Sequence, residues 1–207
     1  MYAPASLRLT AAHDEREFWE RHVLDALKLV QLLSKQISSQ KLEAIDIGSG
    51  NGIPGIPIAI AMPHWQVAVL DSNNKRCGFL DMFCKYNCLE NVSVLAGRAE
   101  TIARNPTCRA HFDIVFGRAL AKLPIALELC LPFLKVQGLL IIPHGPSFQN
   151  ELTLSENALH ELGASLSQKI PYSLNKNCEL TALIFHKDSA TPERYPRKVG
   201  IPKKHPL

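Results

Sequence analysis

The sequence has no long apolar run, and this absence limits what the protein can be. The longest apolar stretches, residues 56–62 and 127–134, are interrupted by proline or acid. They are far shorter than the roughly 20 residues that a membrane-spanning helix needs. Residues 1–4 also lack the basic leader and apolar stretch of a secretory signal. We therefore expect a cytoplasmic protein without a membrane partner.

Paired cysteines are missing as well. Six cysteines are scattered along 207 residues, and the tightest group, Cys77, Cys84 and Cys88, falls on one predicted helix without metal-ligand spacing. We interpret them as reduced thiols and expect no metal site. Repeats and flexible linkers are also absent, and 46% apolar residues suffice for one core. One domain over residues 1–207 is the prediction, with a monomer favoured.

Charge is balanced everywhere except at the C-terminus. The formal net charge is +4, and residues 189–207 alone carry five Lys or Arg against one Glu. Four prolines in this tail predict a basic extended arm without a helix. Its cations suit phosphate contacts, although a solvated tail that only aids solubility is the alternative. The candidate phosphate ligands are Arg197, Lys198, Lys203 and Lys204.

Short apolar runs alternate with helical patterns through the middle of the chain. An amphipathic N-terminal helix is predicted within residues 13–36. The predicted strands are residues 42–47, 66–70, 92–95, 112–116 and 139–142. The predicted helices between them are residues 56–61, 75–88, 99–103 and 124–134. Continuous apolar strands that alternate with helices indicate a doubly wound α/β domain with a mainly parallel sheet.

The last part of the chain follows a different pattern. A predicted helix at 148–162 precedes two β-like runs, 164–170 and 180–186, with no helix between them. An antiparallel hairpin at the sheet edge is the simplest arrangement. The domain then divides into an N-terminal helical segment (1–38), an α/β core (39–188) and the basic tail (189–207).

A glycine-rich turn follows the first predicted strand, at Asp46-Ile47-Gly48-Ser49-Gly50-Asn51-Gly52. Glycine permits positive φ and lets the backbone approach a ligand closely. Asp71 ends the second strand about twenty residues later, where a carboxylate can bind ribose hydroxyls. Gly48, Gly50 and Asp71 therefore predict an adenosine-bearing cofactor; a tight turn without a ligand is the alternative.

The spacing of the turn narrows the choice of cofactor. A dinucleotide fingerprint needs a third glycine three residues after the second, but Ile53 stands there, followed by Pro54. Prolines at the start of the next helix remove amide donors that a pyrophosphate would use. A methyl donor without phosphate, S-adenosylmethionine, therefore fits better than a nicotinamide dinucleotide.

Two further strand ends extend the predicted pocket. Gly97-Arg98-Ala99-Glu100 follows the third strand, where the amide of Ala99 and the side chain of Glu100 could reach adenine. Gly117-Arg118-Ala119 follows the fourth strand and faces the predicted transfer site. Arg98 and Arg118 could instead be surface cations.

The fourth strand lacks the residues that two common acceptors need. Its end has no Asn/Asp-Pro-Pro-aromatic turn for an exocyclic amine, and no cysteine nucleophile for pyrimidine carbon. Guanine N7 has a free lone pair and no proton to lose, so alignment alone can suffice. Arg118 is then expected to position the substrate by contacting phosphate, guanine O6 or the cofactor, with no acid/base residue.

These residues together resemble the RsmG (GidB) family of bacterial small-subunit rRNA guanine-N7 methyltransferases. The matching segments run from about Leu9 to the last residue: Arg21-His22-x-x-Asp25, the run 46–57, Leu70-Asp71-Ser72, Arg98-Ala99-Glu100, Arg118-Ala119 and the ending 196–207. The resemblance implies a class I, Rossmann-like methyltransferase fold. It implies cofactor contacts at Gly48, Ile53, Ala99, Glu100 and Arg118, with Asp71 and Ser72 on the ribose side.

The same resemblance implies that a guanosine of 16S rRNA, on the small ribosomal subunit, accepts the methyl group. Arg21 and His22 could cap the pocket and bind RNA, or form a surface ion pair with Asp25. Two features depart from the family. A helical segment with a Trp-Asn pair is absent at the start, and His144 replaces the usual lysine after the fifth strand. His144 would bind RNA better when protonated.

Two other functions stay open at this point. A methyltransferase of the same fold could act on a small molecule or a protein, which would leave the basic tail without a role. A nucleotide-sensing binding protein without catalysis is the second alternative.

Overall fold

Seven strands form one mixed sheet, and their order brings the first, second and fourth strands together. The structure is a computed structural model, and it describes residues 18–34, 41–175 and 178–207. The strands are β1 (Glu43–Ile47), β2 (Gln66–Asp71), β3 (Val92–Ala96), β4 (Phe112–Phe116), β5 (Leu134–His144), β6 (Ala164–Asn175) and β7 (Cys178–Lys187). Their spatial order is β3-β2-β1-β4-β5-β7-β6.

The first five strands are parallel, β7 runs in the opposite direction, and β6 at the sheet edge again runs in the direction of the first five. Buried strands such as β1 and β2 read as continuous apolar runs because helices cover both faces of the sheet. β7 pairs antiparallel with both β5 and β6. The α/β class, the mainly parallel sheet and the C-terminal edge hairpin are therefore confirmed.

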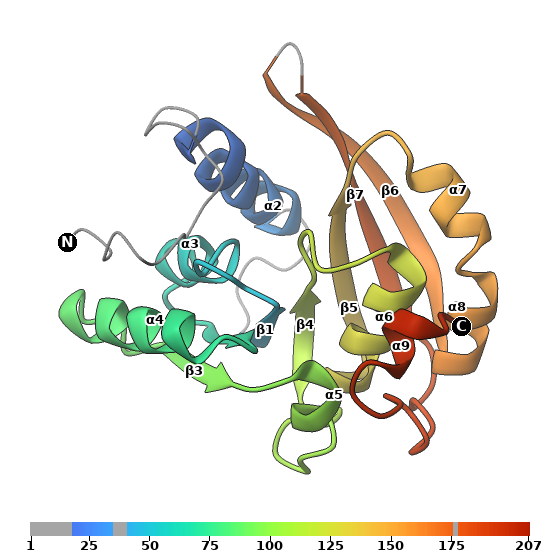
Figure 1. The fold of residues 1–207 in the computed structure, drawn as a ribbon. Helices are drawn as coiled ribbons and strands as arrows, with labels where there is room; N and C mark the ends of the chain where they lie inside the picture. Colours follow the sequence, from blue (N-terminus) through green and yellow to red (C-terminus); the bar gives the residue numbers. More distant parts are fainter. Residues whose placement is uncertain (1–17, 35–40, 176–177) are drawn as a thin grey trace.

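Helices lie on both faces of the sheet (Figure 1). The helical elements are η1 (Trp19–Val23), α2 (Leu24–Ser34), α3 (Gly55–Ala61), α4 (Asn74–Tyr86), α5 (Ala99–Ile102), α6 (Leu123–Cys130), η2 (Leu131–Phe133), α7 (Phe148–Thr153), α8 (Glu156–Leu162) and α9 (Ile201–Lys204). Local chemistry sets their limits. The Asn73 side chain, for example, accepts hydrogen bonds from the amides of Lys75 and Arg76 at the start of α4.

Several predicted boundaries differ from the structure, among them the start of β5 at Leu134 and the end of β6 at Asn175, and three differences have a clear local cause. The predicted helix 124–134 ends earlier, because Leu134 already begins β5. β5 extends to His144 because β7 pairs with it from Leu139 onward. The predicted helix 148–162 is two helices, interrupted where the hydroxyl of Ser155 bonds to the carbonyl of Glu151. Of the predicted helix 13–36, only residues 18–34 are described, as η1 and α2.

The C-terminal tail is not the extended arm that its prolines predict. Residues 201–204 form the short helix α9, with Pro202 in its first turn, where proline costs no hydrogen bond. Tyr195 and Pro202 are buried against the domain. The prediction was wrong because prolines exclude a long helix but not packing against the core. The tail is therefore part of the folded domain.

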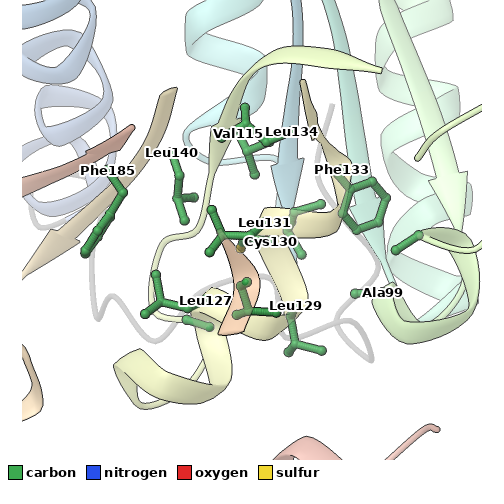
Figure 2. Packing of buried hydrophobic residues seen from close by; sticks show 14 of the residues in the cluster. Ala99, Val115, Leu127, Leu129, Cys130, Leu131, Phe133, Leu134, Leu140 and Phe185 are labelled. Carbon is green, nitrogen blue, oxygen red and sulfur yellow. The ribbon is translucent and has the colours of Figure 1, made fainter. Parts of the chain in front are cut away.

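The largest apolar cluster lies between the sheet and the helices α6 and α8 (Figure 2). All eight residues of α6 are buried, so this helix is apolar on every side except for one acid, Glu128. Leu127 and Phe133 are completely inaccessible to solvent. α6 therefore forms the centre of the core that holds the ends of β4 and β5 in place.

Substitution of Leu127 by alanine tests this packing. Because Leu127 is 0% exposed, Leu127→Ala is expected to lower the free energy of unfolding by about 3 kcal/mol. The matched control is Leu154→Ala, at a leucine that is 69% exposed, with an expected change under about 0.5 kcal/mol. Urea unfolding followed by circular dichroism measures both. Equal losses would contradict the assignment of α6 to the core.

Candidate active site

The turn after β1 brings the backbone of three glycines to the carboxyl edge of the sheet. Gly48, Gly50 and Gly52 have φ values of 70°, 59° and 85°, a conformation that glycine adopts without steric cost. The amide of Gly48 donates to the carbonyl of Leu70 at the end of β2, at 2.8 Å. A Cβ on Gly48 would lie 2.5 Å from Cδ1 of Leu120. The turn is thus close-packed and glycine-dependent.

Asp71 fastens this turn to the end of β2. Its Oδ2 accepts a hydrogen bond from the amide of Gly50 at 2.9 Å, and its Oδ1 accepts one from Asn73 at 2.8 Å. The carboxylate is 6% exposed, while the neighbouring Ser72 is exposed. Each carboxylate oxygen can accept a second hydrogen bond. Asp71 can therefore hold the turn and also receive ribose hydroxyls.

The amides that open α3 are already occupied. Gly52 and Ile53 donate to the carbonyl of Ser49, and Gly55 donates to Oδ2 of Asp46 at 2.9 Å. A pyrophosphate needs free amides at a helix start. The observed bonding therefore agrees with a cofactor without phosphate, as the position of Ile53 predicts.

Three buried oxygens at this edge lack a hydrogen-bond donor among the residues that the structure describes: Asp46 Oδ1, Ser49 Oγ and Glu100 Oε2. Buried polar atoms are normally paired, so such atoms at a sheet edge point to a ligand with donors. S-adenosylmethionine carries an ammonium group, two ribose hydroxyls and an adenine amine. The residues at the edge therefore fit this cofactor.

Asp46 is a site residue that the sequence reasoning did not single out. It is 1% exposed, and burial raises the pKa of its carboxyl to about 7. The hydrogen bond from Gly55 and the positive charge of Arg118 lower this pKa but do not offset the effect of burial. A neighbouring ammonium group would favour its ionised form. The available signal was an acid within a buried apolar strand, a residue that seldom stays buried without a partner.

Ala99 and Glu100 follow β3 and begin α5, as predicted. Glu100 is 4% exposed, and its Oε1 accepts from Arg98 at 3.1 Å and from the amide of Gly200 at 3.2 Å. Burial alone would raise the pKa of Glu100, but hydrogen bonds from its own backbone, Arg98 and Gly200 hold it below the ordinary value. Glu100 is therefore an acceptor in its charged form.

Arg118 joins the end of β4 to the N-terminal helical segment. Its Nε donates to Oδ2 of Asp25 at 2.7 Å, and its Nη2 lies 2.9 Å from the carbonyl of Arg21 and 3.0 Å from Nδ1 of His22. The hydroxyl of Tyr172 donates to the other oxygen of Asp25 at 2.6 Å. Asp25 is 1% exposed, so this buried carboxylate is satisfied from both sides.

A cavity of about 290 Å³ opens where β4 and β5 end. Asp25, Arg118, Leu120 and His144 contribute to its lining. Leu120 also packs against Gly48, so the cavity adjoins the glycine turn. Ala119 in its wall has a φ of 49°, a strained conformation for a residue with a side chain. The cavity is the candidate acceptor site.

The structure brings most of the predicted cofactor residues together at one edge of the sheet. The predicted RNA ligands fall into two groups, one beside the acceptor cavity and one on the C-terminal segment. Arg21 and His22 contact Arg118, and His144 lies in the acceptor cavity, 3.4 Å from Glu151. Lys198, Lys203 and Lys204 are exposed. Arg197 is not free for phosphate, because its guanidinium is paired with the buried carboxylate of Glu128. That prediction was wrong for Arg197.

Within residues 18–34, 41–175 and 178–207, no cluster of three or more His, Cys, Asp or Glu side chains is arranged to hold a metal. No helix in those ranges is long and apolar enough to cross a membrane.

Solved structures with low sequence identity share the fold of this chain. One is M. jannaschii TYW2 in complex with AdoMet, with a TM-score of 0.60, 17% identity, and coverage of 78% of this chain and 76% of that one. Another is a mutant 16S rRNA (adenine(1408)-N(1))-methyltransferase with cosubstrate SAM from Catenulisporales acidiphilia. Its TM-score is 0.60 at 16% identity, over 78% of this chain and 92% of that one. The likeness shows that the chain has the fold of a class I S-adenosylmethionine-dependent methyltransferase.

Sequence comparisons narrow the class to a family. Residues 3–179 match the family described as GidB, rRNA small subunit methyltransferase G. A Streptococcus suis protein named Ribosomal RNA small subunit methyltransferase G is 38% identical over 201 residues, covering 97% of this chain and 84% of that protein. A Lactococcus lactis subsp. cremoris protein of the same name is 36% identical over the same shares. The chain belongs to the rRNA small subunit methyltransferase G family.

Asp46 generates a pH-dependent prediction. Its folded pKa of about 7 lies above the ordinary value of 3.8, so its contribution to stability is lost as the pH rises from about 4 through 7. The free energy of unfolding is therefore expected to fall by roughly 4 kcal/mol over this pH range, because the buried carboxyl becomes ionised. Asp46→Asn is expected to remove this fall, because asparagine does not ionise. Thermal unfolding without cofactor at several pH values measures it. The control is Asp81→Asn at an exposed acid, and parallel pH profiles for Asp46→Asn and the wild type would contradict the assignment.

Asp71 generates a prediction about cofactor affinity. Asp71→Ala removes the acceptor for the Gly50 amide and for the ribose hydroxyls, and is expected to raise the Kd for S-adenosylmethionine by about tenfold or more. Isothermal titration calorimetry measures this change. Asp113→Ala, at a strand acid paired with Lys135, is the control with an unchanged Kd. An unchanged Kd for Asp71→Ala would remove the assigned cofactor site.

Proposed function

We propose that the protein transfers a methyl group from S-adenosylmethionine to N7 of a guanosine in 16S rRNA of the small ribosomal subunit. Membership of the rRNA small subunit methyltransferase G family supports ribosomal RNA as the substrate. The guanine N7 acceptor rests on the chemistry of the site.

The observation that carries this proposal is the polar lining of the acceptor cavity. Its buried carboxylate, Asp25, is occupied by Arg118 and Tyr172, and its imidazole, His144, lies against Glu151 and the carbonyl of Gly145. An acceptor amine or hydroxyl would need a group free to take its proton. Guanine N7 has no proton to lose and needs no such group. A cavity that aligns the base and excludes water is therefore sufficient.

Each part of the chain then has a defined task. When bound, S-adenosylmethionine supplies an electrophilic sulfonium methyl group. The glycine turn and Asp71 hold the cofactor, and Leu120, which packs against Gly48 and lines the cavity, lies where cofactor and base would meet. Arg118 orients the base by donating to guanine O6 or to phosphate, and leaves the N7 lone pair free. Asp25 keeps Arg118 in that place.

A basic surface outside the cavity supports a polyanionic substrate. Lys198, Lys203 and Lys204 are exposed on the C-terminal segment, and Arg21 is exposed beside the cavity. Contacts of such cations with phosphates are sequence-independent and weaken with salt. The enzyme acts as a monomer in the cytoplasm in this proposal.

Methylation of purified subunits tests the proposal. Small subunits from cells that lack the enzyme are incubated with the protein and methyl-labelled S-adenosylmethionine, and the rRNA is digested to nucleosides. All label is expected in 7-methylguanosine. Label in another nucleoside would overturn the acceptor. Label absent from rRNA but present in a small molecule or protein would favour the alternative methyltransferase function.

The exposed lysines generate a separate prediction. Lys203→Ala with Lys204→Ala is expected to raise the KM for subunits and to reduce the salt dependence of kcat/KM by a log–log slope of roughly 1.5 to 2, because two phosphate contacts are lost. The Kd for S-adenosylmethionine should not change. The control pair is Lys41→Ala with Lys85→Ala, two exposed lysines outside the segment. The same effect in both pairs would show that net charge, not docking by the tail, is responsible.

A further inference from the structure

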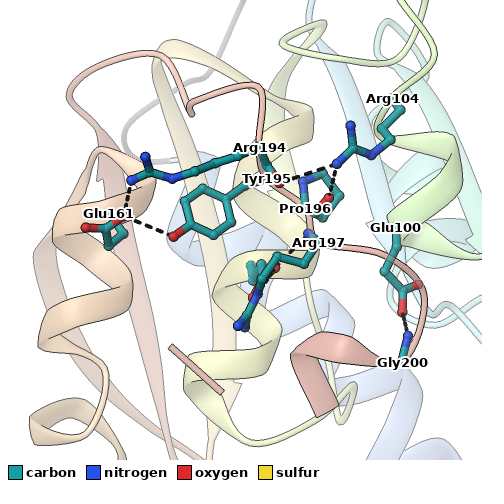
Figure 3. A network of polar contacts seen from close by, with 9 residues as sticks. Glu100, Arg104, Glu161, Arg194, Tyr195, Pro196, Arg197 and Gly200 are labelled. Atoms are coloured by element: carbon teal, nitrogen blue, oxygen red, sulfur yellow. Dashed lines mark hydrogen bonds and ion pairs between the residues drawn. The ribbon is translucent and has the colours of Figure 1, made fainter. Parts of the chain in front are cut away.

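The C-terminal segment, residues 189–207, is held in place by its backbone. After α5, Arg104 donates to the carbonyl of Pro196 at 2.7 Å, and Arg109 donates to the carbonyls of Tyr195 and Thr191, each at 2.9 Å. Figure 3 shows the segment passing from Glu161, past Arg104, to Glu100. Its path is therefore fixed by residues of the core domain.

The strongest anchor of the segment is the pair of Arg197 with Glu128. Glu128 is 0% exposed and accepts from the backbone amide of Arg197 at 2.8 Å, from its Nε at 2.9 Å and from its Nη2 at 2.6 Å. A buried carboxylate is tolerated only when it is fully paired. The pair therefore fixes the backbone at position 197, three residues before Gly200.

Gly200 connects this fixed backbone to Glu100, which lies on the predicted adenine side of the cofactor site. Its amide lies 3.2 Å from Oε1 of Glu100, the oxygen that also accepts from Arg98. Both donors use Oε1, while Oε2 is buried and has no partner among the described residues. Gly200 has a φ of 83°, which a residue with a side chain adopts only under strain.

We propose that the C-terminal segment completes the adenine subsite of the cofactor pocket. Glu128 and Arg197 are positioning residues that place the amide of Gly200, and this amide aims Oε2 of Glu100 at the exocyclic amine of adenine. The inference rests on the cofactor site of the proposed function and does not depend on which base of RNA is methylated. It gives the packing of this segment a role in cofactor selection in addition to RNA contact.

A double-mutant cycle tests the link between Glu128 and Glu100. Glu128→Gln and Glu100→Gln are each expected to raise the Kd for S-adenosylmethionine, by about fivefold to tenfold for a lost charge-assisted hydrogen bond. If Glu128 acts through Glu100, the double variant should bind no more than about twofold worse than Glu100→Gln. Additive effects, or an unchanged Kd for Glu128→Gln, would overturn the proposal.

A second pair of variants tests the same proposal without changing the buried charge of Glu128. Gly200→Ala and Gly78→Ala both place a Cβ in open space, but only Gly200 has a positive φ, so only this substitution shifts the amide. Each protein is titrated with S-adenosylhomocysteine and with S-inosylhomocysteine, in which a carbonyl replaces the adenine amine. Wild type and Gly78→Ala should prefer the amine. Gly200→Ala and Glu100→Gln should lose most of that preference.

The ratio of the two affinities distinguishes a misplaced Glu100 carboxylate from a loss of stability. A protein that is only less stable would bind both ligands more weakly by the same factor. An unchanged ratio in Gly200→Ala, with S-adenosylhomocysteine still bound by the wild type, would overturn the inference and leave the proposed function standing. Failure of the wild type to bind either ligand would overturn both.

Discussion

The structure depends on one geometric constraint, which is that parallel strands place all their carboxyl ends at the same edge of the sheet. β1, β2 and β4 are neighbours, so the glycine turn, Asp71 and Arg118 meet although they are far apart in sequence. The carboxylate of Asp71 connects the first two by accepting from Gly50. The turn can follow this close-packed path only because its three glycines accept positive φ.

Two buried acids then attach the chain ends to this edge. Asp25 binds Arg118 at the acceptor cavity, and Glu128 binds Arg197 near the predicted adenine side. Each is satisfied by several donors, which is the condition for a buried carboxylate to persist. The N-terminal helical segment and the C-terminal segment are thereby joined to opposite parts of one site. Under the proposed roles, a change in either pair would alter the binding of substrate or cofactor.

Local patterns predicted the elements well and long-range pairs poorly. The apolar runs located β1 to β4 within about a residue, because buried strands differ from their surroundings. Asp71 and the glycines followed from spacing along one βαβ unit. Tyr172 pairs with Asp25 across 147 positions, and Arg197 with Glu128 across 69. No local pattern encodes such partners. The sequence therefore predicts a basic extended tail, although a lone acid in the apolar helix α6 is a signal for a buried pair.

The central claim is that this edge methylates N7 of one guanosine in small-subunit rRNA. Mapping 7-methylguanosine along 16S rRNA, by chemical cleavage at the modified base, tests it most directly in cells with and without the gene. The account predicts one cleavage site that disappears with the gene and returns with the wild type but not with Asp71→Ala. An identical pattern of 7-methylguanosine in both strains would contradict it.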